Sequence, residues 1–418
     1  MIALYSCTFT LGIFLVYFLV YRKNPHGFHS INVFTYCYAL YTLSIPISYF
    51  FFENSFLYIE QFLFIQNLGI YGVLLSIVAA RSILPHSKYH LYTFTLKNQY
   101  LFFASLLLFI AMYFIYLQTF KGGVVNYLTV GYQYGEDSST LEKVFGVFSI
   151  HPLSALISVW FISSYGNNRY NTIMCLGIAF LFTVLLSAGG HRNLALWLLS
   201  PLLMYACYKK LQLKIVKSMI FTFIIYLTGM LVGVFRHYGF GDIDGFKEAL
   251  SGGAQIFDPR SQELVTSYNV MTYWFDGSAA KFWLYPFESY ILGLINLLPK
   301  FIFPVSDTSI ADNFSTAFAA PGEGLGFSIN LEALLNFGVM GPFIIGFILG
   351  GLLYWLNRSV FNSRFKLVAF CIYLNLPAVA LNLNRIDFAT VIKLLMIKVI
   401  FMVLVFFIFI ISKRKSFE

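Results

Sequence analysis

Long runs of apolar residues recur along the whole chain, separated by short polar segments. A helix of about 20 predominantly apolar residues is long enough to cross a lipid bilayer. Eleven such runs are present, at 2–21, 31–52, 57–80, 98–118, 145–164, 172–189, 193–208, 216–235, 329–356, 366–383 and 391–412. These runs are much longer than the strands of a membrane β-barrel and do not alternate apolar with polar positions. We therefore predict an all-α polytopic membrane protein with about 11 transmembrane helices.

The longest polar segment divides the chain into three parts. Residues 1–235 form an N-terminal bundle of about eight helices, with an outer loop at 119–144, and residues 329–418 add about three more helices. Residues 236–328 form a large outer loop. Because a structureless loop of about 90 residues is unusual, we expect this loop to be partly helical.

One apolar stretch of the large loop, at 281–304, is interrupted by Pro286, Glu288 and Pro299. It could lie at the membrane interface, re-enter the membrane or span it. We favour the interfacial placement, because an additional span would invert the charge pattern of the loops that follow.

The positions of the basic residues predict the orientation. Alternating the loops across the membrane brings a set of basic residues to the side that carries the C-terminus: Arg22, Lys23, Arg81, Lys88, Lys97, Arg169, Lys209, Lys210, Lys214, Lys217, Arg358, Arg364, Lys366, Lys413, Arg414 and Lys415. Cytoplasmic loops carry the excess of Lys and Arg, so the C-terminus is predicted inside and the N-terminus outside. We interpret the N-terminal run as a first transmembrane helix rather than a removable signal.

The composition supports this class and excludes others. The chain is 59% hydrophobic and only 11% charged, with a mean hydropathy of +0.75, whereas soluble domains carry about 25% charge. Soluble enzymes, secreted disulfide scaffolds and disordered proteins are therefore excluded. The net charge of +9 follows from the orientation and does not indicate a nucleic-acid partner.

Motifs for cofactors and metals are not found in the sequence. All five cysteines lie in apolar stretches, and neither a CxxC nor a Cys/His metal-ligand spacing occurs. The predicted cytoplasmic loops lack phosphate-binding glycine motifs, which argues against a cytosolic nucleotide or nucleotide-sugar substrate. We expect no metal and no cofactor, and we look for function on the outer face.

Candidate anion-binding residues lie at the predicted outer ends of helices. His191 and Arg192 follow Gly189 and Gly190 between two apolar runs, where a guanidinium needs an anionic partner and matches the geometry of phosphate oxygens. The alternative is an arginine that contacts lipid headgroups.

Three further arginines are predicted on the same face. Arg236 and His237 end the run 216–235, where a cation also suits the helix dipole. Arg260 lies in the large loop and could equally be a surface or ion-pair residue. Arg385 could bind substrate or be neutralised by Asp387 two residues later.

Two carboxylates lie close to the start of the run 329–356, one before it and one within it. Glu323 lies in a glycine-rich approach to the membrane, and Glu332 falls in the first turns of the apolar helix with Asn336 one turn further on the same face. Glu332 could orient or deprotonate an attacking hydroxyl, with Glu323 and Asn336 binding substrate. The alternative is a structural ion pair with Arg192 or Arg236.

These features together resemble the Wzy-type polymerases, which join oligosaccharide repeat units of O-antigen or capsule in bacterial inner membranes. The resemblance rests on the helix number, on the outer turn Gly189-Gly190-His191-Arg192, and on the large outer loop before the last helices. The stretch 326–341, with Glu332 and Asn336-Phe-Gly, is similar to a segment of that family that enters a late helix. His191 departs from the family, which has Ser or Gly before this arginine.

The resemblance implies a metal-independent, GT-C-like glycosyltransferase. Its donor and acceptor would both be undecaprenyl-diphosphate-linked glycans, with Glu332, Arg192 and Arg236 as catalytic residues and His191, His237, Arg260, Glu323, Asn336 and Arg385 as substrate-binding residues. A chain-length regulator and a flippase would be partners. The related O-antigen ligases and a lipid-linked oligosaccharide flippase or transporter are the alternatives; the missing internal repeat argues against a transporter.

Overall fold

The computed structural model describes residues 1–21, 30–83, 90–129, 140–188, 192–210, 263–297, 309–319, 326–361 and 366–416. The first part contains α1 (Ile2–Tyr21), α2 (Ser30–Phe51), α3 (Ile59–Ile83), β1 (His90–Leu96), α4 (Gln99–Phe120), α5 (Val124–Thr129), α6 (Thr140–Ser164), α7 (Arg169–Ala188) and α8 (Arg192–Lys210). The second part contains η3 (Glu263–Val265), α11 (Thr266–Phe275), η4 (Ser278–Phe282), α12 (Glu288–Ile295), α13 (Ile310–Phe318), α14 (Ile329–Phe337), η5 (Gly338–Met340), α15 (Gly341–Phe361), α16 (Leu367–Leu374), α17 (Leu376–Asn382), α18 (Phe388–Phe409) and β2 (Ile410–Ser416).

Seven helices in the described ranges are long and apolar enough to cross a membrane. They are α1, α3, α4, α6, α7, α18 and the stretch Ile329–Phe361, which comprises α14 and α15. The chain is therefore a multi-pass membrane protein, as predicted. A shorter apolar helix covers Asn193–Tyr208 within α8, and the predicted run 216–235 lies outside the described residues.

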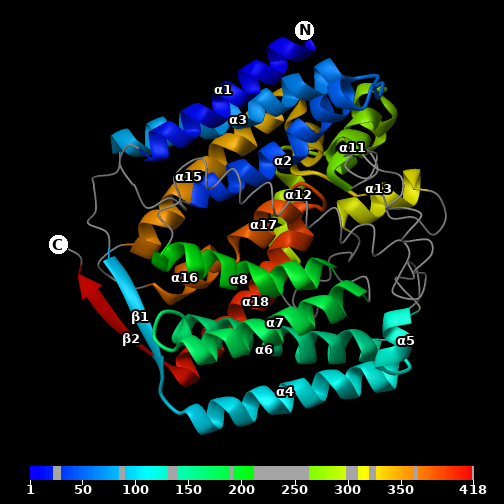
Figure 1. The fold of residues 1–418 in the computed structure, drawn as a ribbon. Helices are drawn as coiled ribbons and strands as arrows, with labels where there is room; N and C mark the ends of the chain where they lie inside the picture. The colour runs from blue at the N-terminus through cyan, green and yellow to red at the C-terminus, as the bar shows by residue number, and fades with distance from the viewer. Residues whose placement is uncertain are drawn as a thin grey trace.

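The helices form two groups with α16 and α17 between them (Figure 1). In one group α3 packs between α1 and α15. In the other group α6 is central and contacts α4, α7, α8 and α18. α17 contacts both α2 and α8, so it joins the two groups.

The contact between α3 and α15 depends on residues without side chains. A Cβ atom at Gly72 would collide with the carbonyl oxygen of Phe343, and a Cβ atom at Gly346 would collide with the carbonyl oxygen of Gly69. In a lipid environment the hydrophobic effect does not bring helices together, so close packing between small residues is a main source of affinity. These glycines therefore let the two backbones pack in direct contact.

Two predicted runs differ from the observed elements near the C-terminus. The run 366–383 is divided into α16 and α17 at Asn375, whose side-chain amide donates to the carbonyl oxygen of Cys371 at 2.8 Å. Pro377 follows in the first turn of α17, where its missing N–H costs nothing. The run 391–412 ends as a helix at Phe409 and continues as strand β2.

The all-α prediction is therefore incomplete in one detail. β2 pairs with β1 in a two-stranded antiparallel sheet, with Phe94 opposite Ser412. Tyr92 and Phe94 alternate with less buried threonines along β1 and turn into the protein. The sheet ties the segment before α4 to the end of α18 at one end of the molecule (Figure 1).

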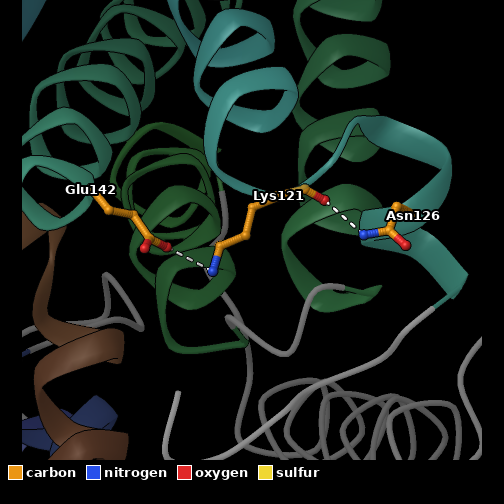
Figure 2. A network of polar contacts seen from close by, with 3 residues as sticks. All are labelled: Lys121, Asn126 and Glu142. Carbon is orange, nitrogen blue, oxygen red and sulfur yellow. Dashed lines mark hydrogen bonds and ion pairs between the residues drawn. The ribbon is translucent and has the colours of Figure 1, made fainter. Parts of the chain in front are cut away.

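The described ends of the loop 119–144 are joined by an ion pair. Lys121, which follows α4, contacts Glu142 in the first turn of α6 at 2.7 Å, and both side chains are largely shielded from solvent. Figure 2 shows this pair together with Asn126 of α5, whose amide donates to the carbonyl oxygen of Lys121 at 3.0 Å. The contacts hold the ends of α4 and α6 together.

The described part of the large loop 236–328 contains only short helices: η3, α11, η4, α12 and α13. Within the stretch 281–304, α12 has eight residues, about 12 Å of helix, and is too short to cross a bilayer. Residues 298–304 lie outside the described residues. α12 packs on the first turn of α18, where a Cβ atom at Gly293 would approach the Cα atom of Ala389 to 3.0 Å.

Candidate functional site

Glu332 lies in a short helix, α14, in which every residue except the last is buried. α14 begins after Ser328, whose hydroxyl accepts a hydrogen bond from the Leu331 N–H at 3.1 Å and so caps the helix. Every residue of α14 from Ile329 to Asn336 is buried, and the exposed fraction of Glu332 is 1%. A carboxylate in such a place is costly to desolvate, so its partners decide what it can do.

One oxygen of Glu332 is anchored to the start of another helix. Its Oε2 atom accepts a hydrogen bond from the Phe388 N–H at 2.8 Å, and Phe388 is the first residue of α18. The first N–H groups of a helix lack intrahelical partners and carry partial positive charge. The N-terminus of α18 therefore stabilises the Glu332 carboxylate.

A second buried carboxylate lies at the same helix end. Asp387 is fully buried and caps α18, because its Oδ1 atom accepts a hydrogen bond from the Thr390 N–H at 3.2 Å. Asp387 is close enough to Glu332 for the two charges to interact. One helix N-terminus thus holds two carboxylates 55 positions apart in the sequence.

Each carboxylate has one oxygen for which the described residues provide no hydrogen-bond partner within bonding distance. Within the described residues, Glu332 Oε1 and Asp387 Oδ2 are buried and have no hydrogen-bond partner, and the same is true of the Tyr290 hydroxyl. Buried polar atoms without partners are uncommon in native structures and often belong to sites that receive a ligand or a proton. These atoms mark the cluster as the candidate site.

α12 covers this site. The Asn336 amide donates to the Ser289 hydroxyl at 2.9 Å and to the Glu332 carbonyl oxygen at 2.7 Å, so it links α12 to α14. The Ser289 hydroxyl in turn lies beside the Glu332 carboxylate. Tyr290 packs against Phe388 with ring centroids 5.2 Å apart.

Tyr290 places a phenol in the helix that covers the site. Burial raises the pKa of Tyr290 well above its ordinary range, and the neighbouring Glu332 charge raises it further. The phenol therefore stays protonated near neutral pH and can donate a hydrogen bond.

A separate polar network holds the other side of α14. The Asn330 amide donates to the Tyr38 hydroxyl and to Gln66 Oε1, both at 2.8 Å. Thr42 donates to the same Gln66 oxygen at 3.1 Å. This network fixes α14 to α2 and α3, and so it positions Glu332 without contacting it.

The structure brings three of the predicted site residues to this region. Glu332 and Asn336 lie in α14, and the Arg385 carbonyl oxygen accepts a hydrogen bond from the Phe327 N–H at 2.7 Å. Arg385 therefore ties the approach to α14 to the turn before α18. Asp387 caps α18 by accepting a hydrogen bond from the Thr390 N–H.

Arg192 begins α8 near the same region. The Asn382 amide donates to Asn193 Oδ1 at 2.6 Å, which places the start of α8 beside the end of α17. Of Arg192 itself only the backbone is described. The other predicted site residues lie outside the described residues: His191, Arg236, His237, Arg260 and Glu323.

Sequence reasoning did not identify Ser289, Tyr290 or the role of Asp387. Asp387 carried a signal, because an Asp directly before a long apolar run is a typical N-cap. Ser289 and Tyr290 carried none, because their position against Glu332 depends on how the large loop folds back. Comparisons with protein-family models, with curated proteins and with solved structures find no match for this chain.

Proposed function

We propose that this protein is a glycosyltransferase that joins undecaprenyl-diphosphate-linked oligosaccharide repeat units into a surface polysaccharide. The observation that carries the proposal is the buried Glu332 carboxylate, with one oxygen anchored at the N-terminus of α18 and the other oxygen available. A carboxylate positioned in this way can act as a general base that accepts a proton from a substrate hydroxyl group. The resemblance to the Wzy-type polymerases supplies the substrate class.

The chemistry requires one base and a site for a leaving anion. The acceptor's sugar hydroxyl attacks the anomeric carbon of the donor while its proton passes to the available oxygen of Glu332. The bond between that carbon and the diphosphate oxygen breaks, and the electron pair leaves with undecaprenyl diphosphate. Arg192 and Arg236 neutralise the charge that develops on the diphosphate.

The other groups around Glu332 have supporting roles in this proposal. Phe388 N–H and Asn336 hold Glu332 and its helix in place. Asp387 Oδ2 and the Tyr290 hydroxyl are free to bind hydroxyls of the acceptor sugar as acceptor and donor. The site would lie at the periplasmic face of the bacterial inner membrane, with the N-terminus periplasmic and the C-terminus cytoplasmic.

The test is complementation of a strain from which this gene is deleted, with the surface and lipid-linked glycans separated on a gel. Glu332→Gln keeps the size of the side chain but removes the base, and we expect it to abolish polymer. Glu60→Gln is the matched control, because Glu60 also lies in the first turn of a long apolar helix but is exposed and outside the site. Membrane abundance is measured for each variant.

The glycan pattern of the deletion strain separates the candidate functions. Single repeat units on the final acceptor indicate a polymerase, whereas full-length polymer retained on its lipid carrier indicates a ligase. Repeat units that stay in the cytoplasmic leaflet indicate a flippase. Wild-type polymer from Glu332→Gln at normal abundance would refute the proposed catalytic role.

A further inference from the structure

The Glu332 site is closed in this structure, and α12 forms part of its cover. Glu332 is 1% exposed and Asp387 is fully buried, so neither carboxylate can meet a substrate while the helices stay in this arrangement. The Ser289 hydroxyl and the Tyr290 ring of α12 lie directly against the site. If Glu332 acts on a substrate, as the proposed function requires, a covering element has to move.

α12 has one face on the site and another face exposed. The face toward α14 and α18 consists of three buried residues, Ser289, Tyr290 and Gly293. The exposed side chains are apolar: Ile291 and Leu294 are each 53% exposed, and Leu292 is also exposed. A helix face built of exposed Ile and Leu is typical of contact with lipid or with a partner rather than with water.

The surroundings of α12 indicate that lipid contacts this exposed face. α12 packs on the first turn of α18, which is long and apolar enough to cross a bilayer. The residue before α12, Phe287, packs on Phe337 at the end of α14 with ring centroids 4.7 Å apart. The next residues after Phe337 form η5, whose exposed Val339 and Met340 lead directly into α15. The exposed apolar side chains therefore adjoin the ends of two membrane-spanning segments, where the acyl chains of the bilayer are the matching environment.

Two hydrogen bonds link α12 to α14, and a strained residue precedes α12. The bonds join Ser289 to the Asn336 side chain at 2.9 Å and 3.4 Å. Phe287 has a φ angle of 67°, in the left-handed region that residues other than glycine enter at a cost. Strained backbone of this kind is found at elements that switch between two arrangements. Rotation about Phe287 would release the strain as the two hydrogen bonds break.

We propose that α12 is a lateral gate, which swings toward the bilayer and admits the sugar-bearing end of a lipid-linked substrate to Glu332 directly from the membrane. The lipid chain of the substrate stays among the acyl chains that contact the exposed face of α12. This inference rests on the proposed function for the identity of the substrate. The movement of α12 itself can be measured without any glycan.

The test is carbodiimide labelling of Glu332 in the purified full-length protein in lipid nanodiscs, read by peptide mass spectrometry. Dicyclohexylcarbodiimide partitions into the bilayer, whereas ethyl-dimethylaminopropyl carbodiimide is charged and stays in water. Glu60 is the internal control, because it lies in the first turn of α3 and is exposed. Relative to Glu60, we expect the lipid-soluble reagent to label Glu332 at least about tenfold faster than the water-soluble reagent.

A disulfide between α12 and α18 should lock the gate. A Cβ atom at Gly293 would lie 3.1 Å from the Ala389 Cβ atom, slightly closer than the about 3.5–4.5 Å typical of a disulfide, so a small adjustment allows the bond. In Gly293→Cys/Ala389→Cys we expect oxidation to reduce Glu332 labelling at least about tenfold, because labelling follows the fraction of open molecules. Dithiothreitol should restore it. The two single variants are the matched controls and should not respond to oxidation, and Glu60 labelling should stay constant throughout.

Each outcome decides part of the proposal. Equal labelling of Glu332 by the two reagents, relative to Glu60, would overturn the route from the membrane. Unlabelled Glu332 with both reagents would overturn the opening, and unchanged labelling of the oxidised double variant would show that α12 does not move. The comparison of reagents uses the wild type, so it tests the proposal even if the double variant does not fold.

The labelling result and the glycan pattern can fail separately. Loss of polymer from Glu332→Gln together with labelling that contradicts the gate would refute this inference alone. Wild-type polymer from Glu332→Gln together with the expected labelling would refute the proposed function alone.

Discussion

Asp387 both caps α18 and carries a negative charge, and two substitutions can separate the contributions of the cap and the charge to stability. Its Oδ1 atom accepts the Thr390 N–H at 3.2 Å, and its second carboxylate oxygen lies beside the Glu332 site. Asp387→Asn keeps an oxygen acceptor for Thr390 and removes the charge. Asp387→Ala removes both.

The expected costs follow from the burial of the cap. Loss of an N-cap side chain typically costs about 1 kcal/mol. Asp387 is fully buried, so water cannot replace it, and an unpaired buried donor costs about 1–3 kcal/mol. Removing the charge forgoes its favourable interaction with the helix dipole but also relieves repulsion from Glu332, so these effects oppose one another. We therefore expect Asp387→Ala to destabilise by about 1–3 kcal/mol and Asp387→Asn by less than about 1 kcal/mol.

Thermal unfolding in detergent, followed with a thiol-reactive fluorophore, measures this difference. The assay suits the protein because Cys175, Cys207 and Cys371 are buried and are expected to react on unfolding; Cys7 and Cys37, which are not buried, are replaced by Ser in every variant. Asn98→Ala is the matched control: Asn98 caps α4 through the Leu101 N–H at 3.1 Å but is exposed, so its loss should cost less. If Asp387→Asn melts as low as Asp387→Ala, the capping argument is wrong.

Two further predictions concern packing and orientation. Gly346→Ala should destabilise the protein by at least about 1 kcal/mol in the same melting assay, because the new Cβ atom would collide with the backbone of α3. Gly177→Ala is the control: its Cβ atom meets nothing within 4 Å, so this variant should be neutral or stabilising. Equal effects of the two substitutions would contradict the packing argument. The predicted orientation puts the C-terminus in the cytoplasm and the 119–144 loop in the periplasm. A fluorescent protein fused to the C-terminus should therefore fluoresce, and alkaline phosphatase fused after Lys121 should be active. The reverse pattern would show that the predicted orientation is wrong.

Much of the helical architecture could be predicted from the sequence, because a lipid bilayer forces backbone polar groups to pair within each segment. Apolar runs such as 98–118 and 145–164 therefore correspond closely to α4 and α6. The proximity of Glu332 and Asn336 also follows from sequence, since residues four apart share a helix face. Their hydrogen bond at 2.7 Å is local.

Contacts between distant segments were decided only by the tertiary structure. The pairing of β1 with β2 joins segments about 320 residues apart. The pattern of apolar positions along a segment predicts its secondary structure but does not indicate which distant segment it pairs with. Asp387 and Glu332 meet because α12, α14 and α18 pack together, and Lys398 finds Ser154 because α6 packs on α18. Apolar periodicity determines which segments become helices, whereas the polar atoms inside them acquire their partners only when particular helix faces pack against one another.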